Sequence, residues 1–350
     1  MAQRDHLRAW ALPLKPEEAY PAKAPRIIFA DLDSPGISRR RVRGRWAYID
    51  AEGQRITDRD ELDRLQRIGL PPAYADAWFS PRPDAHILAV GVDDRGRRQY
   101  RYHPDYIADR DGRKFERCAE FGLALPRIRK RVETDLATRG LSEQRALACV
   151  VRLLDSGRIR IGNEHYARSN RSFGATTLLQ RHATLRGDRL TLQFRAKSGK
   201  LCTFCVTDRG LARFIKRMQD LPGQHLFQYV GEDGAAWPIS SSDVNRYIRE
   251  TTDADFSAKD FRTWTASALA FEWLHGRTAG MTCTDLFSFV AEHLGNTPAI
   301  ARKSYIHPAL VDMAKAKDWA KATLSLPRRT RWLSRYERGL LAFLERLDQA

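Results

Sequence analysis

The chain has 350 residues, enough for a sizeable core and about two domains, and its 43% hydrophobic and 10% aromatic content excludes wholesale disorder. No run approaches the roughly 18 apolar residues of a membrane span, and residues 1–13 lack the apolar core of a secretory signal, so we expect a cytoplasmic protein without a membrane partner. The 60 lysines and arginines against 43 aspartates and glutamates give a net charge of +17, which favours a polyanionic partner because each neutralised phosphate releases counterions.

The first third of the chain predicts a tail and a small β domain. Residues 1–25 contain prolines at 13, 16, 21 and 25, which is typical of a loosely attached N-terminal tail. From 26 to 110, aromatic and β-branched runs alternate with turns, with a hairpin-like end at 46–53 and a strand at 85–92. A short helix is expected near 58–68, and a tight turn at 93–96 precedes the run 97–102. We therefore predict a mainly β domain over residues 26–110.

The remainder, residues 111–350, predicts a larger, mainly α-helical domain. Apolar residues recur at helical spacing over 127–138, 142–156, 211–220, 240–251, 258–274, 284–294 and 308–323, and 328–350 resembles a charged amphipathic helix. Three short strands, 176–184, 189–196 and 201–207, interrupt the helices and are joined by turns at 186–188 and 198–199. The predicted fold class is α+β, with a three-stranded antiparallel sheet carried by the helical domain.

The cysteines do not predict a metal site. Cys202 and Cys205 have metal or redox spacing, but no second such pair or histidine pair follows, and their surroundings predict a strand. The five cysteines of the chain suit a reducing compartment without disulfides. We expect neither a metal nor a cofactor.

Two basic segments flank the first predicted strands of the helical domain. In 158–167 (RIRIGNEHYA), Arg160 follows a helix and, alone, could be an ordinary surface arginine. In 194–200 (FRAKSGK), a hairpin turn places Lys197 at its tip, where a lysine can be simply solvated or can enter a groove and deliver a proton. The spacing GxxxxGK[ST] of a phosphate loop is absent, which excludes nucleotide hydrolysis of that type.

Two later segments add a phosphate-binding face and a phenol. In 259–264 (KDFRTW), Lys259 and Arg262 are three residues apart near the positive end of a helix, which suits a phosphate. In 294–308 (LGNTPAIARKSYIHP), one helix ends, Asn296 lies at the junction, and a short helix leads to Tyr305. A tyrosine alone is usually a packing residue whose hydroxyl contacts water. Tyr305 therefore predicts a function only in combination with the other segments.

Together, these segments resemble the type IB DNA topoisomerases, specifically the short bacterial and poxvirus form. The resemblance covers about residues 45–315 and depends on the order and spacing of several motifs. Its marks are 69–74 (GLPPAY), 90–104 (VGVDDRGRRQYRYHP), 160–166 (RIGNEHY), the Lys197 hairpin, 259–262 (KDFR) and 295–298 (GNTP) followed by Tyr305.

The resemblance implies a reaction and roles for the catalytic residues. In such enzymes a tyrosine attacks a DNA phosphodiester, forms a 3′-phosphotyrosyl link, releases a 5′-hydroxyl and later reseals the strand, which relaxes positive and negative supercoils without ATP or metal. Tyr305 would be the nucleophile, and Arg160 and Arg262 would bind the nonbridging oxygens. Lys197 would protonate the departing oxygen, with Lys259 as a second lysine to assist it.

One position departs from the better-known family pattern. The phosphate-contacting histidine of poxvirus and nuclear members is Asn296 here. An asparagine can donate a hydrogen bond to a phosphate, but it cannot carry charge or shuttle a proton. Any general-acid role at this position is therefore in doubt.

The resemblance also implies a double-stranded DNA partner and residues that contact it. The first domain would close over the duplex as half of a clamp, with Gln99, Tyr100 and Tyr102 against bases and backbone in the major groove. Asn163 and Tyr166 would lie against phosphates, and the implied catalytic fold is that shared by tyrosine recombinases and type IB topoisomerases. A monomer associated with the nucleoid is the simplest expectation, because one chain holds every catalytic group.

Two alternative functions remain open from the sequence. A tyrosine recombinase shares the helical domain and the chemistry, but such enzymes usually have His-x-x-Arg where this chain has Lys259 and Arg262. A non-catalytic DNA-binding protein would satisfy the charge, but it would not need an arginine, a hairpin lysine, an arginine and a tyrosine in that order.

Overall fold

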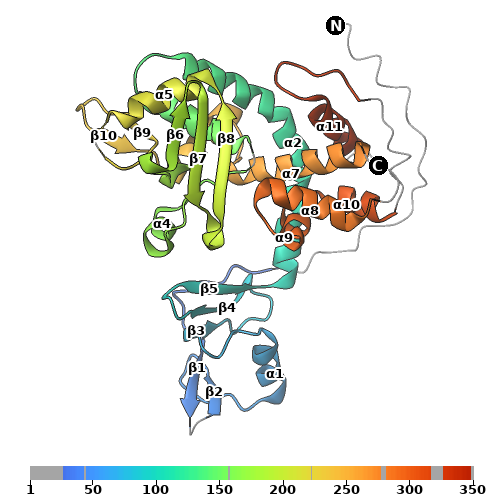
Figure 1. Ribbon diagram of the computed structural model, residues 1–350. Helices are drawn as coiled ribbons and strands as arrows, with labels where there is room; N and C mark the ends of the chain where they lie inside the picture. Colours follow the sequence, from blue (N-terminus) through green and yellow to red (C-terminus); the bar gives the residue numbers. More distant parts are fainter. Residues whose placement is uncertain are drawn as a thin grey trace. The chain divides into compact units, whose positions relative to one another are not determined.

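A computed structural model describes residues 27–42, 45–156, 158–221, 223–276, 281–316 and 326–347, and the chain divides into two compact units, Met1–Lys114 and Phe115–Ala350 (Figure 1). The expected tail, residues 1–25, lies outside the described residues. Within the described part of the chain, every helix is too short or too polar to cross a membrane.

The first unit is mainly β, as the sequence predicts, and consists of an antiparallel five-stranded sheet, one short helix and the first turns of a longer helix. The strands lie in the order β2-β1-β3-β4-β5. Helix α1 begins after Asp58, whose side chain accepts a hydrogen bond from the Glu61 N–H at 2.8 Å. Leu65 of α1 and Phe79 of the sheet are buried in the same hydrophobic cluster. The elements are β1 (Ile37–Val42), β2 (Arg45–Ile49), α1 (Arg59–Arg67), β3 (Ala75–Phe79), β4 (Ile87–Val92) and β5 (Arg98–Tyr102).

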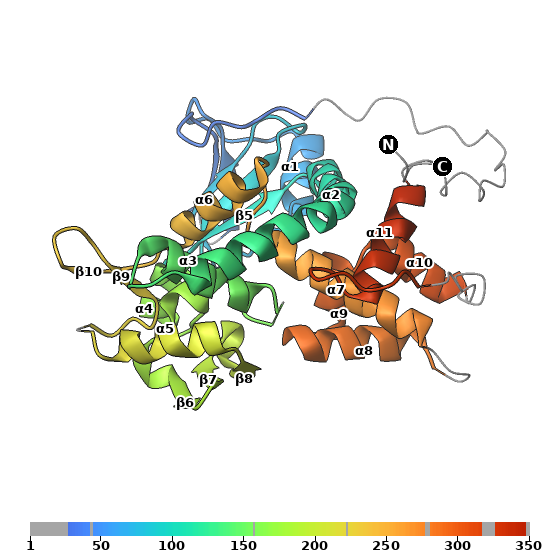
Figure 2. The ribbon, with the colours of Figure 1, turned by 90° about the horizontal axis from the view of Figure 1, so that it is seen from above.

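The second unit is mainly helical and contains the predicted three-stranded sheet, in the order β6-β7-β8. Helix α5 packs on this sheet through β7 (Figure 2), and a two-stranded ribbon of β9 and β10 follows it. The elements are α2 (Pro104–Ala137, which begins in the first unit), α3 (Glu143–Leu154), α4 (Glu164–Asn170), β6 (Ala183–Arg186), β7 (Arg189–Arg195), β8 (Leu201–Thr207), α5 (Arg209–Gln219), β9 (Gln228–Val230), β10 (Ala236–Pro238), α6 (Ser241–Thr252), α7 (Ala258–His275), α8 (Cys283–Leu294), α9 (Pro298–Ser304), α10 (Pro308–Ala316) and α11 (Arg335–Leu347).

Three elements differ from their sequence-based bounds. Helix α2 begins at Pro104 rather than near 127, and it contains Pro126. The strand expected over 176–184 instead spans Ala183–Arg186, because short 3₁₀ turns occupy 175–177 and 180–182. The last helix begins at Arg335 rather than near 328, and residues 317–323 of another expected helix lie outside the described residues.

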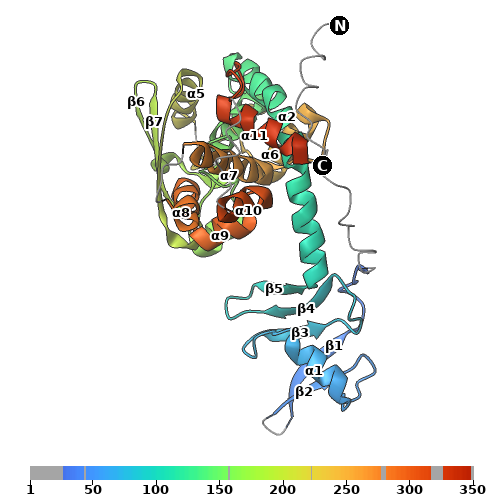
Figure 3. The same ribbon diagram turned by 90° about the vertical axis from the view of Figure 1, so that its right-hand side faces the viewer.

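Helix α7 is at the centre of the second unit and packs against α8, α10 and α11 (Figure 3). Gly339 of α11 permits close approach, since a Cβ there would lie 2.6 Å from the Phe271 ring of α7. A helix that is apolar on most sides, as α7 is, belongs in a core. Side chains of α7 are therefore fixed from several directions.

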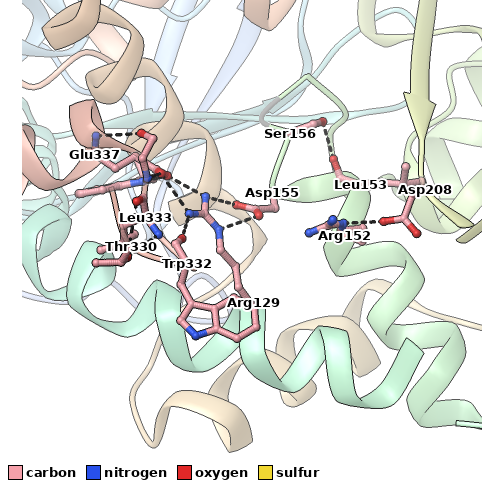
Figure 4. Close-up of polar contacts among 12 residues, drawn as sticks. Arg129, Arg152, Leu153, Asp155, Ser156, Asp208, Thr330, Trp332, Leu333 and Glu337 are labelled. Atoms are coloured by element: carbon pink, nitrogen blue, oxygen red, sulfur yellow. Dashed lines mark hydrogen bonds and ion pairs between the residues drawn. The ribbon is translucent and has the colours of Figure 1, made fainter. Parts of the chain in front are cut away.

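A half-buried ion network ties α2, α3 and α11 together beside α7. The Arg129 guanidinium lies between the carboxylates of Asp155, 2.9 Å away, and Glu337, 2.7 Å away (Figure 4). Glu337 also accepts a hydrogen bond from the Trp264 indole of α7 at 3.2 Å. A cavity of about 860 Å³ adjoins the network, but no residue that the sequence assigns to catalysis or DNA binding lines it.

Candidate active site

Arg160 is placed by a tightly packed loop between α3 and α4. The Arg160 carbonyl accepts a hydrogen bond from the Ala175 N–H at 2.8 Å, and the Ile161 carbonyl accepts one from Thr176 N–H at 2.8 Å. Gly174 makes this approach possible, because a Cβ there would lie 2.6 Å from the Arg160 carbonyl oxygen. The backbone of Arg160 is therefore fixed, and its half-buried side chain reaches the groups described next.

Arg262 projects from α7 into the interior and is only 4% exposed. Its Nη2 donates to the Leu294 carbonyl at 2.8 Å, and its Nη1 donates to the Arg158 carbonyl at 3.3 Å. Burial, followed by the nearby charge of Arg160, lowers the pKa of Arg262 to about 10. The guanidinium thus remains charged at neutral pH and is rigidly held.

Asn296 joins the two arginines. Its Oδ1 accepts a hydrogen bond from Arg160 Nη2 and another from Arg262 Nη2, the latter at 3.2 Å. The residue follows Gly295, whose positive φ of 65° ends α8, and its N–H bonds to the Ala291 carbonyl at 2.9 Å. Its Nδ2 is buried and has no hydrogen-bond partner among the described residues, so this donor is available to an added acceptor.

Tyr305 completes the group at the C-terminal end of α9. The Arg262 guanidinium carbon lies 5.0 Å from the centroid of the tyrosine ring, and both Arg262 and Arg160 hydrogen-bond the side chain. Burial raises the pKa of Tyr305, but the charges and hydrogen bonds of Arg262 and then Arg160 outweigh it and lower the pKa below its ordinary value. The sequence-predicted Arg160, Arg262, Asn296 and Tyr305 thus converge at one place.

Lys197 lies on the turn between β7 and β8, as predicted. It is exposed and has no hydrogen bond or ion pair to the other described residues. Burial raises the pKa of Cys202, near the start of β8, and the nearby charges of Arg158, Arg160 and Arg262 only partly oppose this rise. Strand β8 of the hairpin therefore adjoins the arginines, and the lysine lies at the exposed turn of the same hairpin.

Lys259 lies in the first turn of α7 and is exposed. No hydrogen bond or ion pair joins it to another described residue, whereas Arg262, three residues on, is buried in polar contacts. The two cations of this motif therefore occupy different environments.

The three residues expected to read DNA in the first unit lie on β5, an edge strand of the described sheet. Tyr100 and Tyr102 share one face and stack with ring centroids 6.0 Å apart. Gln99 lies on the opposite face because side chains alternate along a strand, and its Nε2 donates to Asp93 at 2.9 Å. The strand thus presents a tyrosine pair and, separately, an amide oriented by a carboxylate.

Asn163 and Tyr166 lie together at the start of α4. The Asn163 side chain caps this helix by accepting a hydrogen bond from the Tyr166 N–H at 3.1 Å. The Tyr166 side chain is 48% exposed. Both residues are therefore accessible at the end of the loop that carries Arg160.

The cysteine pair does not form a joint site. Cys202 and Cys205 are both on β8 and three residues apart, so their side chains point to opposite faces. Within the described ranges, no group of three or more histidine, cysteine, aspartate or glutamate side chains could hold a metal ion.

One contact residue escaped the sequence analysis. Ser267 of α7 is fully buried, donates to the Tyr305 carbonyl at 3.4 Å and accepts a hydrogen bond from the His307 N–H at 3.1 Å. The available signal was a hydroxyl among apolar residues of a helix, five positions after Arg262.

Comparison with known protein families finds two matches along the chain. Residues 103–319 match the family described as eukaryotic DNA topoisomerase I, catalytic core. Residues 45–93 match the family described as bacterial DNA topoisomerase IB, N-terminal domain.

Individual proteins that resemble this chain are also DNA topoisomerases. The chain is 28% identical over 285 residues to DNA topoisomerase 1B of Acanthamoeba polyphaga mimivirus, covering 77% of this chain and 85% of the relative. It is 21% identical over 271 residues to DNA topoisomerase 1B of vaccinia virus (strain Copenhagen), covering 75% and 84%. Among solved structures, the XerH site-specific recombinase bound to difH matches at 14% identity and a TM-score of 0.35, covering 55% of this chain and about half (52%) of the recombinase. That TM-score is too low to bear on the fold.

Proposed function

This chain belongs to the type IB DNA topoisomerase family, because the catalytic-core match alone spans residues 103–319 of 350, and we propose that Tyr305 is the nucleophile with which it relaxes supercoiled DNA. The observation that carries the assignment is the contact of the Tyr305 side chain with Arg262 and Arg160. A phenol held against two guanidinium groups is both a better nucleophile and adjacent to a binding place for phosphate.

The reaction is a reversible transesterification at a DNA phosphate. Tyr305 loses its proton to solvent, and the phenolate oxygen bonds to phosphorus as the bond to the 5′-oxygen breaks. Once that oxygen takes up a proton, the products are a 3′-phosphotyrosyl link and a 5′-hydroxyl. The energy of the broken DNA phosphodiester is retained in the phosphotyrosyl bond, so the reverse attack of the 5′-hydroxyl reseals the strand without ATP. Between the two steps, the free end can rotate about the intact strand and release torsional strain of either sign.

The arginines would act on the phosphate during both steps. Arg160 and Arg262 are charged donors that can face the nonbridging oxygens, whose charge grows in the pentacoordinate transition state. Asn296 now accepts from both arginines and has a buried Nδ2 without a partner among the described residues. When phosphate oxygens become the arginines' acceptors, the Asn296 amide can donate to the same phosphate.

Proton delivery is assigned to the hairpin lysine. A departing 5′-alkoxide is too basic to leave unprotonated, so a general acid is needed. Lys197 is exposed at the turn of a hairpin whose strand β8 adjoins the arginines. A movement of this turn on DNA binding would bring its ammonium to the 5′-oxygen, and Lys259 would assist from the start of α7.

Double-stranded DNA is the substrate that the family membership supports. We assign backbone and base contacts to Tyr100, Tyr102 and Gln99 in the first unit, and phosphate contacts to Asn163 and Tyr166 in the second. A monomer that clamps one duplex, associated with the nucleoid and without a membrane partner, is the form that we propose.

A plasmid assay tests the function. Negatively and positively supercoiled plasmids, incubated separately without ATP and with EDTA, are both expected to relax. Tyr305→Phe removes only the hydroxyl, so this variant is expected to bind plasmid normally and to leave its linking number unchanged.

The same assay separates the alternatives. A protein that only binds DNA would leave the linking number of every plasmid unchanged, and a site-specific recombinase would require a particular sequence. Relaxation by Tyr305→Phe would show that the nucleophile is another residue.

A further inference from the structure

We propose that Ser267 is a positioning residue for the reaction, and that its hydroxyl fixes the turn from which Tyr305 reaches the two arginines. This role rests on Tyr305 being the nucleophile. It assigns a catalytic contribution to a side chain that touches neither the phosphate nor the phenol oxygen.

The turn at Tyr305 is an unusual place for a nucleophile that must be held precisely. Tyr305 ends α9 with φ −135° and ψ −38°, which is no longer helical, and α10 begins three residues later at Pro308. The intervening Ile306 is fully buried, and Tyr305 and His307 on either side of it are partly buried. Buried peptide groups need hydrogen-bond partners that the turn itself supplies only in part.

The Ser267 hydroxyl supplies such partners on both sides of Ile306. It accepts a hydrogen bond from the His307 N–H at 3.1 Å and donates to the Tyr305 carbonyl at 3.4 Å. Ser267 itself is 0% exposed, and its two backbone partners are partly buried. One oxygen thus bridges the two peptide units that flank the buried isoleucine.

The same helix carries the main partner of the phenol. Arg262 and Ser267 are both on α7, five residues and about 7.5 Å apart along the helix axis. Arg262 lies over the ring of Tyr305, while Ser267 holds the backbone of Tyr305. Helix α7 therefore sets the distance between the nucleophile and the cation that favours its phenolate.

Loss of the hydroxyl should affect geometry more than folding. A displacement of about 1 Å between reacting groups can cost on the order of 100-fold in rate. We expect Ser267→Ala to lower the single-turnover rate constant of DNA cleavage about 10- to 100-fold at saturating enzyme, while the affinity for duplex DNA stays within about twofold. The rising limb of its pH–rate profile is expected to move to higher pH, because a loosened Tyr305 loses contact with its cations.

A matched control separates positioning from the general loss of a buried hydroxyl. Thr252 of α6 is 6% exposed, and its hydroxyl donates to the Ile248 carbonyl at 2.8 Å. Thr252→Val removes that hydroxyl and keeps the shape, so it should lower the free energy of unfolding and leave both the cleavage rate and the pH profile unchanged. Ser267→Cys keeps a weak donor and acceptor and should fall between wild type and Ser267→Ala.

These experiments distinguish a wrong role for Ser267 from a wrong assignment of Tyr305 as the nucleophile. If Tyr305→Phe still forms covalent DNA adducts, the nucleophile assignment fails. If Tyr305→Phe is inactive but Ser267→Ala cleaves at the wild-type rate with an unshifted pH profile, or if Thr252→Val slows cleavage equally, the role of Ser267 is refuted. Should Ser267→Ala not fold by circular dichroism, the rate and pH profile of Ser267→Cys decide the question by the same criteria.

Discussion

Replacing Arg262 by glutamine should slow DNA cleavage and shift its pH dependence in a predictable direction. The change removes the guanidinium that lies 5.0 Å from the Tyr305 ring and donates to the Leu294 carbonyl at 2.8 Å. Loss of one preorganised donor to a developing oxyanion typically costs about 3 kcal/mol. At about 1.4 kcal/mol per factor of ten, cleavage should be roughly 100-fold slower or worse.

The pH effect follows from the sign of the shift at Tyr305. Arg262 and Arg160 lower the pKa of this phenol because they favour its negatively charged form. Without Arg262 the pKa rises, so the phenolate fraction at any given pH falls. The rising limb of cleavage rate against pH should therefore lie at higher pH in Arg262→Gln than in the wild type.

The assay is single-turnover cleavage of a labelled duplex at saturating enzyme over a series of pH values. Arg145→Gln is the matched control, because Arg145 is 5% exposed, donates to the Gly140 carbonyl at 2.9 Å and lies 5.5 Å from the Phe214 ring, away from the tyrosine. It should lose stability while keeping the rate and the profile. An Arg262→Gln variant with the wild-type rate and an unmoved profile would refute the proposed active site.

Three further predictions concern other parts of the unit. Lys197→Ala should cleave slowly with the natural 5′-oxygen but almost normally with a 5′-bridging sulfur, which leaves without a proton; equal slowing with both substrates would exclude Lys197 as the acid. Asn296→Ala should cleave about fivefold more slowly because a hydrogen bond of about 1 kcal/mol is lost. Asn296→His should stay near the wild type in the same cleavage assay, and equal rates for both variants would contradict the donor role. Glu337→Ala should lower the free energy of unfolding, measured in urea, by about 2–3 kcal/mol. This is less than the roughly 3–5 kcal/mol for leaving a buried charge unpaired, because Arg129 retains its ion pair with Asp155. An unchanged free energy of unfolding would show that the ion network does not stabilise the fold.

Local sequence patterns predict the bounds of an element where the turn residues agree with the alternation of apolar and polar residues. The strand Leu201–Thr207 has the bounds that the sequence predicts, and the hairpin turn carries Lys197 as expected. Helix α1 likewise begins after Asp58, a common N-cap residue. In these places the nearest neighbours in sequence determine the structure.

Other bounds depend on contacts that a pattern does not reveal. The first half of α2 is rich in charged residues, and Pro126 resembles a helix start, so its apolar spacing was recognised only from 127 onward. Thr176 and Thr177 have strand propensity, but Thr176 bonds to the loop of Arg160 instead of a neighbouring strand. For α11, a capping box of Ser334 and Glu337 marks the start, with the Ser334 N–H donating to Glu337 at 2.8 Å, and the Ser-x-x-Glu spacing is a signal that the sequence itself carries.

The contacts within the active site could not be predicted from residue spacing alone. The resemblance named Arg160, Arg262, Asn296 and Tyr305, but nothing local indicates that Asn296 would accept from both arginines. The contacts of Ser267 join segments 38 and 40 residues apart. Such contacts arise from helix packing, which a single sequence does not encode in a readable form.

The most direct test of the account is to identify the amino acid that becomes linked to DNA. The protein would be trapped on a duplex whose cleaved 5′ fragment dissociates, then digested, and the DNA-bearing peptide would be analysed by mass spectrometry. The account predicts a single adduct on Tyr305, joined to the 3′-phosphate of the DNA. A link through another residue, or to the 5′-phosphate, would contradict it.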